Sequence, residues 1–208
     1  MTNPTTTIRV WDAPVRIFHW LLAACFAGAY LTAESESWRL LHVTLGYTLG
    51  GLIAFRLVWG VLGTRYARFA SFVRSPSVLK LYVGSLLAGR PAHFTGHNPL
   101  GGVAIVLMLL AGAAITATGY AVYNDIGGEW LGEAHEAAAN AMLVLVAVHL
   151  CGVALASWMH RENLPRAMVT GLKQGQPADG IKRLWWPVAM AMVIAVGVFW
   201  YLQWRLAL

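Results

Sequence analysis

Five long apolar segments constrain this sequence more than any other feature. A helix needs about 20 mostly apolar residues to cross the roughly 30 Å hydrocarbon core of a bilayer. Hydrophobic residues make up 58% of the 208-residue chain and charged residues only 12%, which is too little charge to cover the surface of a soluble domain of this length. We therefore predict an all-α membrane protein, with spans at Val15–Ala33, Leu40–Leu62, Leu100–Val122, Glu133–Trp158 and Leu184–Trp204.

The basic residues predict how these spans are oriented. If the N-terminus is cytoplasmic, only Arg39 and Arg205 of the 15 lysines and arginines fall on the outer side. Cytoplasmic loops carry an excess of Lys and Arg. We therefore predict a multi-pass membrane protein, in contact with membrane lipid, with a cytoplasmic N-terminus and a C-terminus on the outer side. The net charge of +6 reflects this topology, and we expect no nucleic-acid partner.

The connection between the second and third spans contains a short amphipathic stretch, Val78–Leu87, in which Lys80 lies among apolar residues. This pattern is typical of a helix on a membrane surface, so we predict an amphipathic helix on the cytoplasmic face. We assign residues 8–171 to a four-helix transmembrane bundle. Residues 172–208 are then a cytoplasmic linker and a fifth, C-terminal transmembrane helix.

Four of the seven histidines are predicted to form two pairs at matching depths. His135 and His149 are 14 residues apart on the fourth span, nearly four helical turns, so both face one side about 21 Å apart along the axis. Chain direction alternates from span to span. His42, at the outer start of the second span, therefore lies at the depth of His135. His19, near the inner start of the first span, lies close to the depth of His149.

Two bis-imidazole sites stacked across a bundle are typical of two b-type haems. Two neutral imidazoles leave no open position on haem iron, which favours electron transfer over oxygen or substrate binding. A structural zinc site requires four clustered ligands rather than two separated pairs. There is no Cys-x-x-Cys-His motif for covalent haem attachment, and we expect Cys25 and Cys151 to be small packing residues. Any one membrane histidine, taken alone, could instead serve a helix–helix hydrogen bond.

Two glycines follow the predicted outer ligand on the second span. Gly46 and Gly50 come one and two turns after His42 on nearly the same face. A glycine lets a flat macrocycle approach the backbone, and on this ground we take Gly46 as a cofactor-binding candidate. A small-xxx-small pair that packs two helices together explains the same spacing equally well.

Three arginines are candidates to neutralise haem propionates through charge-assisted hydrogen bonds. Arg56 is 14 residues past His42, on the same face and near the inner pair, and Arg16 lies one turn before His19. Arg39 is the corresponding candidate for the outer haem. The alternative for Arg16 and Arg56 is that their side chains extend to the inner lipid headgroups.

The three remaining histidines are His93 and His97 in the inner loop and His160 at the end of the fourth span. None of them has a partner at matching depth. We expect all three to be loop or interfacial residues.

Several motifs are similar to those of a known family. The first span opens with VWDAPVRIFHW, the second opens with LLHVTLGY and closes with FRLVWGVLGTRYARF, GHNPLGG precedes the third, and EAHEAAANAMLVLVAVHL contains the fourth-span pair. Together they resemble the bacterial cytochrome b561 and nickel-hydrogenase b-type cytochrome family over residues 8–171. The resemblance implies a four-helix bundle with two b haems, whose axial ligands are His19, His42, His135 and His149. It also implies the bacterial cytoplasmic (inner) membrane, so that the predicted C-terminus is periplasmic. The fifth span lies outside this shared core.

The favoured hypothesis for function is transmembrane electron transfer between the quinone pool and a periplasmic redox partner, such as a c-type cytochrome or an oxidoreductase subunit. Two haems at different depths provide a path that one haem cannot. The acidic outer loops suit a basic soluble partner, although ordinary solvated loops have the same composition.

Two other hypotheses belong to different classes. In one, the chain is the membrane anchor or electron-relay subunit of a larger, hydrogenase-like oxidoreductase. In the other, the histidines form the proton relay of a transporter, which is disfavoured because no carboxylate lies deep in a span. The sequence leaves open whether the chain is an enzyme by itself and whether it forms a homodimer.

Overall fold

The computed structural model describes residues 6–207. The helices are α1 (Ala13–Thr32), α2 (Arg39–Leu62), α3 (Pro76–Leu87), α4 (Pro99–Tyr123), α5 (Trp130–His160), α6 (Leu164–Thr170) and α7 (Trp186–Leu206). The strands are β1 (Thr6–Arg9) and β2 (Leu172–Gly175), and short 3-10 turns occupy Glu36–Trp38, Phe69–Ser71 and Pro177–Asp179.

Five helices are long and apolar enough to cross a membrane: α1, α2, α4, α5 and α7. Each begins and ends within a few residues of a predicted span, and the largest difference is that α5 starts at Trp130 rather than Glu133. Large apolar side chains such as Leu110 of α4 and Val148 of α5 are more than half exposed. Lipid is the environment that such side chains require, so the prediction of an all-α, multi-pass membrane protein is confirmed.

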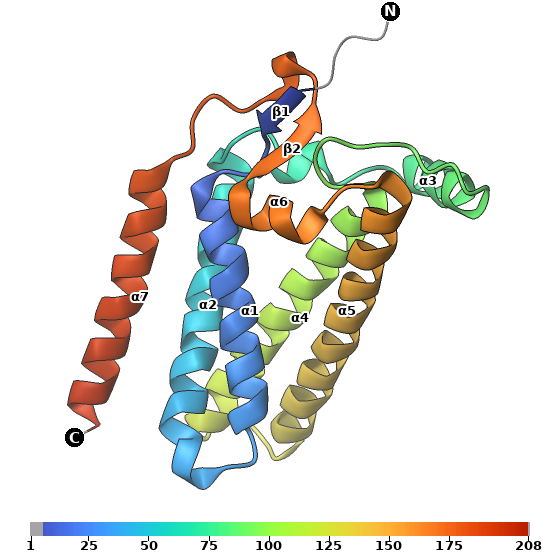
Figure 1. The fold of residues 1–208 in the computed structure, drawn as a ribbon. Helices are drawn as coiled ribbons and strands as arrows, with labels where there is room; N and C mark the ends of the chain where they lie inside the picture. The colour runs from blue at the N-terminus through green and yellow to red at the C-terminus, as the bar shows by residue number, and fades with distance from the viewer. Residues whose placement is uncertain (1–5, 208) are drawn as a thin grey trace, which may run out of the picture.

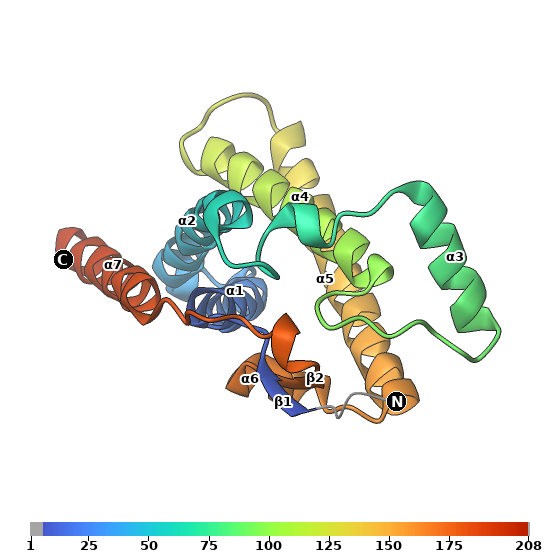
Figure 2. The same ribbon diagram turned by 90° about the horizontal axis from the view of Figure 1, so that it is seen from above.

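Neighbouring helices of the bundle run in opposite directions (Figure 1). Helix α1 packs mainly on α2, and α4 packs mainly on α5, while α2 and α4 join the two pairs. One end of the bundle carries β1, β2, α3 and α6, and we call it the strand end (Figure 1). The other end carries the connections from α1 to α2 and from α4 to α5, and we call it the loop end. Seen from above, α3 and α7 lie on opposite sides of this bundle (Figure 2).

A buried aspartate fixes the start of α1. Asp12 is only 1% exposed. Its Oδ1 accepts a hydrogen bond from the backbone N–H of Val15 at 2.9 Å, which caps the helix. Its Oδ2 accepts from Trp59 Nε1 at 3.1 Å and from Thr64 Oγ1 at 2.6 Å. One carboxylate therefore connects the beginning of α1 to the end of α2 at the strand end.

The segment predicted as a cytoplasmic linker contains the strand β2. β2 pairs antiparallel with β1, with Thr6 opposite Gly175. Beyond β2, the backbone N–H of Ile181 donates to the carbonyl of Arg9 at 2.8 Å. These bonds join residues on both sides of the predicted boundary at residue 171, so residues 6–9 are held against the residues that precede α7.

The predicted surface helix is α3, which begins at Pro76 rather than Val78. It lies at the strand end, to one side of the bundle (Figure 2). Tyr82 is buried, with its ring centre 5.7 Å from that of Phe94, whereas Leu81 and Leu87 are at least three-quarters exposed. The predicted helix is therefore present as α3, and it exposes apolar side chains such as Leu81 and Leu87.

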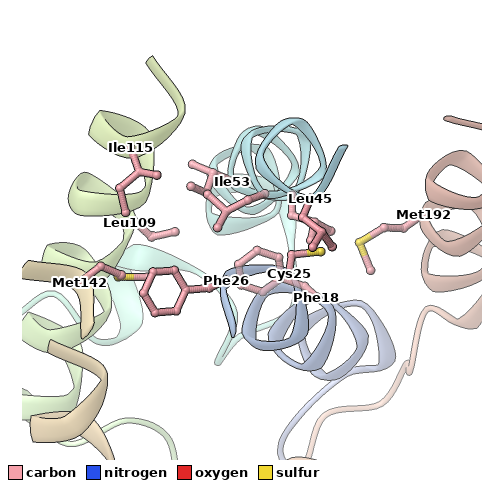
Figure 3. Close-up of a cluster of buried hydrophobic side chains, with 11 residues drawn as sticks. Phe18, Cys25, Phe26, Leu45, Ile53, Leu109, Ile115, Met142 and Met192 are labelled. Carbon is pink, nitrogen blue, oxygen red and sulfur yellow. The ribbon is translucent and has the colours of Figure 1, made fainter. Parts of the chain in front are cut away.

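An apolar cluster occupies the middle of the bundle (Figure 3). Phe26 of α1 and Met142 of α5 point toward each other across it (Figure 3). Met142 is 3% exposed and is seven residues from both His135 and His149 along α5. Buried apolar side chains therefore lie between the levels of the two histidine pairs.

Helix α7 joins this cluster through Met192 (Figure 3). Trp200 of α7 donates a hydrogen bond from Nε1 to Thr48 Oγ1 of α2 at 2.9 Å. The polar atom of this tryptophan thus contacts the bundle. The fifth span is therefore attached to the bundle by a specific polar contact as well as by apolar packing.

Candidate functional site

The structure brings together the histidines that chain direction predicted as pairs. His19 of α1 and His149 of α5 have ring centres 6.5 Å apart, with planes inclined by 54°. His42 of α2 and His135 of α5 have ring centres 6.2 Å apart, inclined by 72°. We call these the strand-end pair and the loop-end pair. Helix α5 supplies one member of each because its two histidines share a face.

Both separations fit a metal atom held between two imidazoles. An iron atom bound by both Nε2 atoms at roughly 2 Å, the usual length of a metal–imidazole bond, places the ring centres about 6 Å apart. Within residues 6–207, no group of three or more His, Cys, Asp or Glu side chains could hold a metal ion. The histidines of these helices are thus arranged as two separate pairs of imidazoles, and each pair could hold a haem iron between its rings.

The loop-end histidines are oriented through their second ring nitrogens. His42 Nδ1 lies 2.9 Å from the carbonyl oxygen of Ala29, and His135 Nδ1 lies 3.0 Å from that of Ile115. A carbonyl oxygen only accepts, so Nδ1 carries the proton and donates in both bonds. The lone pair of each ring is then on Nε2, as a metal ligand requires. These bonds fix the tautomer and the orientation of both rings.

Glycines shape the space near the loop-end pair in two ways. A Cβ atom at Gly119 of α4 would lie 2.8 Å from Cε1 of His135, so glycine is required for the ring to lie against that helix. A Cβ at Gly50 would lie 2.5 Å from Thr116, which makes Gly50 a contact between α2 and α4. No neighbouring atom lies within 4 Å of a Cβ built at Gly46. The two explanations that the sequence left equal therefore apply to different glycines: Gly50 packs helices, and Gly46 faces open space that a macrocycle could enter.

Arg56 is buried near the strand-end pair. It is 3% exposed, and its guanidinium lies 4.9 Å from the ring centre of Phe69 and 5.8 Å from that of Phe72. Its Nη1 is shielded from solvent and has no hydrogen-bond partner among the described residues. A buried cation without a hydrogen-bonded anion is costly, so this side chain is suited to an acidic group of a ligand.

Arg16 has other contacts. Its Nη1 donates to the carbonyl of Val169 at 2.7 Å, and its guanidinium lies 5.4 Å from the ring centre of Trp186. Its Nε is shielded and has no partner within residues 6–207. Arg39, the candidate at the loop end, is exposed and lies 5.9 Å from the ring centre of Tyr123. Arg16 and Arg39 are therefore weaker candidates than Arg56 for binding an acidic group of a buried ligand.

His97 lies in the loop before α4, within the expected class of loop or interfacial residues, but its ring is packed against aromatic side chains. Its ring lies between Trp11 and Phe72, with ring centres 4.5 Å and 4.8 Å away. Its Nδ1 is shielded from solvent and has no partner among residues 6–207. Burial lowers the pKa of His97 to about 3, and the positive charges of Arg56 and Lys173 add to this effect. The ring is therefore neutral at physiological pH.

The sequence contained one indication that His97 has a fixed position. It lies inside GHNPLGG, directly before Asn98, the residue that caps α4. Asn98 Oδ1 accepts from the backbone N–H of Gly101 at 2.7 Å. His93 and His160 have the peripheral positions expected of them. His93 is exposed and its Nε2 lies 3.2 Å from Glu162 Oε1. His160 lies beside it, with ring centres 5.3 Å apart.

Comparison with known proteins agrees with this geometry. Residues 10–171 match the family model of prokaryotic cytochrome b561. The probable Ni/Fe-hydrogenase 1 B-type cytochrome subunit of Escherichia coli (strain K12) is 28% identical over 143 residues, which are 56% of this chain and 60% of that protein. The probable Ni/Fe-hydrogenase B-type cytochrome subunit of Azotobacter vinelandii is 30% identical over 148 residues, 58% of this chain and 61% of that protein.

A longer alignment joins the chain to the probable Ni/Fe-hydrogenase B-type cytochrome subunit of Rhizobium leguminosarum bv. viciae, which is 24% identical over 210 residues, 79% of this chain and 88% of that protein. The chain spans less than two thirds of the length of the Escherichia coli and Azotobacter vinelandii relatives. No solved structure matches it. Because the family match includes both histidine pairs and four of the five apolar helices, the chain belongs to the prokaryotic cytochrome b561 family.

Proposed function

We propose that the chain is a di-haem b-type cytochrome that moves electrons across the membrane. The observation that carries the proposal is the arrangement of four histidines as two facing pairs, one toward each end of a single bundle. In this proposal His19 and His149 are the axial ligands of one haem, and His42 and His135 are those of the other. Membership of a b-type cytochrome family supports haem b as the bound group.

The chain's own residues determine what such a haem can do. A bound haem supplies one-electron redox chemistry. Two imidazoles per site leave no position for oxygen or substrate, so the sites exchange electrons only. Helix α5 holds one ligand of each site on the same face, and the apolar core around Phe26 and Met142 keeps water from the space between them. This arrangement supports a relay from one end of the bundle to the other.

Three further residues are proposed to contact the haems without being axial ligands: Arg56, Arg16 and Gly46. Arg56 is buried, with a free donor atom, which supports a role in neutralising a propionate rather than contact with lipid headgroups. Gly46 leaves room for a macrocycle near the loop-end pair. Arg16 is the weakest of the three because one of its donors is already bonded to Val169.

The second part of the proposal is that a quinone and a periplasmic redox protein, such as a c-type cytochrome, are the two electron partners. Haem sites at two depths support partners on opposite faces of the membrane. Stopped-flow mixing of the purified, dithionite-reduced protein with quinone analogues tests the quinone part, with the His19→Ala and His42→Ala variants as controls that each retain one complete site. We expect reoxidation of the haem absorbance bands. Failure of every quinone to oxidise the protein, together with failure of every quinol to reduce it, would contradict this part.

A second candidate function is an electron-relay or anchor subunit of a larger oxidoreductase. The observation that favours it is that the relatives named above are B-type cytochrome subunits of Ni/Fe-hydrogenases. Reduction by quinol without any partner would support an independent carrier. Co-purification of tagged protein with a hydrogenase-like subunit, and haem reduction that depends on it, would support the subunit function.

A further inference from the structure

Four shielded nitrogen atoms at the strand end lack hydrogen-bond partners. They are Arg16 Nε, His19 Nδ1, Arg56 Nη1 and His97 Nδ1, and they are the complete set of such buried side-chain atoms within residues 6–207. None of them is an oxygen. The two guanidinium nitrogens are donors, and the Nδ1 atom of a neutral imidazole donates in one of its two tautomers. A buried polar atom without a partner is unfavourable, so this cluster is suited to a ligand that brings acceptor oxygens.

Two of these atoms, Arg56 Nη1 and His97 Nδ1, belong to side chains that share one aromatic neighbour. The guanidinium of Arg56 lies 5.8 Å from the ring centre of Phe72, and the ring of His97 lies 4.8 Å from the same centre. Trp11 covers another side of His97 at 4.5 Å. The backbone beside His97 is fixed because Asn98 caps α4. Both side chains are therefore held in place before any ligand binds.

The acidic residue near Arg56 does not satisfy it. Asp12 is the carboxylate whose charge acts on Arg56. Its oxygens already accept hydrogen bonds from Val15, Trp59 and Thr64, and none from Arg56. The guanidinium thus keeps a positive charge and a free donor in a buried position. A carboxylate is the acceptor that matches it best.

His97 completes this donor set without adding a charge. Its low pKa keeps the imidazole neutral, and the charged or titratable groups that act on it are Arg56, Lys173, His149 and His19. The last two are the strand-end pair, so His97 and Arg56 both lie near the haem proposed there. A b-type haem carries two propionate carboxylates on one edge, which are the acceptor oxygens that this cluster lacks.

We propose that Arg56 and His97 together bind a propionate of the haem held by the strand-end pair, with His97 donating from Nδ1. The inference rests on the proposed bis-histidine ligation by His19 and His149. It assigns a cofactor-binding role to a histidine that is not an axial ligand. It also predicts that the two haems differ in potential, because no such shielded donor cluster lies at the loop end within residues 6–207.

The test is a spectroscopic redox titration of the purified holoprotein and its variants. His97→Phe removes the donor but can still pack between Trp11 and Phe72. We expect it to shift the oxidised-to-reduced ratio of one haem roughly tenfold toward the oxidised form at fixed ambient potential, which is about 59 mV for one electron. Arg56→Leu should shift the same haem in the same direction, and the double variant should shift it by less than the sum.

Two further variants separate a hydrogen-bonding role from a merely structural one. His97→Gln retains an amide donor and should restore much of the wild-type potential. His93→Phe, which changes an exposed histidine at the same end of the molecule, should leave both potentials unchanged. Equal potentials for wild type and His97→Phe in a protein with two haems would overturn the inference.

A measurement on a chain that keeps both Arg56 and His97 maintains the test if His97→Phe does not accumulate. Apoprotein of the His42→Ala variant, which retains only the strand-end pair, is titrated with haem and with haem dimethyl ester. We expect binding of the ester to be at least roughly tenfold weaker, because its propionates no longer carry charge. Equal affinity would overturn the inference. Failure of this variant to bind haem at all, or loss of different haems in His19→Ala and His149→Ala, would instead contradict the proposed ligation.

Discussion

Replacing the four paired histidines one at a time is the most direct test of the proposed sites. The two histidines of α5 are 14 residues apart, which is about 21 Å along the helix axis. Two iron–nitrogen bonds of roughly 2 Å each cannot join rings at different levels. With ring centres 6.5 Å apart in one pair and 6.2 Å in the other, each iron can have only one combination of ligands.

Each of these substitutions is therefore expected to remove one haem per chain. His19→Ala and His149→Ala should each lower the haem content from two per chain to about one, and both should remove the same component of the low-temperature absorption spectrum. His42→Ala and His135→Ala should each remove the other component. The loop-end variants should also cost stability, because each leaves a backbone carbonyl without its imidazole donor.

Haem content is measured by the pyridine haemochrome method on detergent-purified protein, normalised to chain concentration. His93→Ala is the matched control, since His93 is an exposed histidine outside both pairs. It should keep both haems and both spectral components. If His19→Ala and His42→Ala removed the same component, the pairing and the depth argument behind it would be refuted.

Three further predictions concern stability, the loop-end site and topology. Asp12→Ala removes a helix cap worth about 1 kcal/mol and two buried hydrogen bonds to a charged group worth about 1.5 kcal/mol or more each. The free energy of unfolding, measured in a graded detergent titration, should therefore fall by on the order of 4 kcal/mol. A decrease below about 1 kcal/mol would show that the three bonds contribute little. Gly119→Val forces a side chain against the ring of His135 and should lower the haem occupancy of the loop-end site or shift the spectrum of that haem only. Gly132→Ala, where a Cβ meets no neighbouring atom within 4 Å, should leave the loop-end haem unchanged. A reporter fused to the C-terminus should be active in the periplasm if the basic residues set the orientation, and a cytoplasmic reporter signal would contradict it.

The membrane spans and the pairing of levels followed from local information. Apolar runs of about 20 residues must become helices in a bilayer, because every backbone polar group has to be satisfied within the segment. Helical periodicity then places His135 and His149 on one face, and alternating chain direction assigns a partner level to each. The structure brings the expected rings together, and their roles as haem ligands stay predictions that the variants above test.

Other features depend on contacts between residues far apart in the chain. The strand pairing brings Thr7 within hydrogen-bond distance of Gln174, 167 residues away, and the short strands show no strong alternation that reveals it. The hydrogen bond from Trp200 of α7 to Thr48 of α2 joins residues that are 152 positions apart. Such contacts depend on helix rotation and tilt, which periodicity alone leaves undefined.

The sequence by itself determined the class of the protein, the number of spans and which histidines share a level, because these follow from span length, helical pitch and the distribution of charge. Only the tertiary structure decided which of the inner-loop histidines is buried. The rings of Trp11 and Phe72 pack against His97, and the pattern of residues near it in the chain does not encode these contacts. The physical reason is that burial depends on what packs around a residue from distant segments, whereas depth in a membrane depends on position along a single helix.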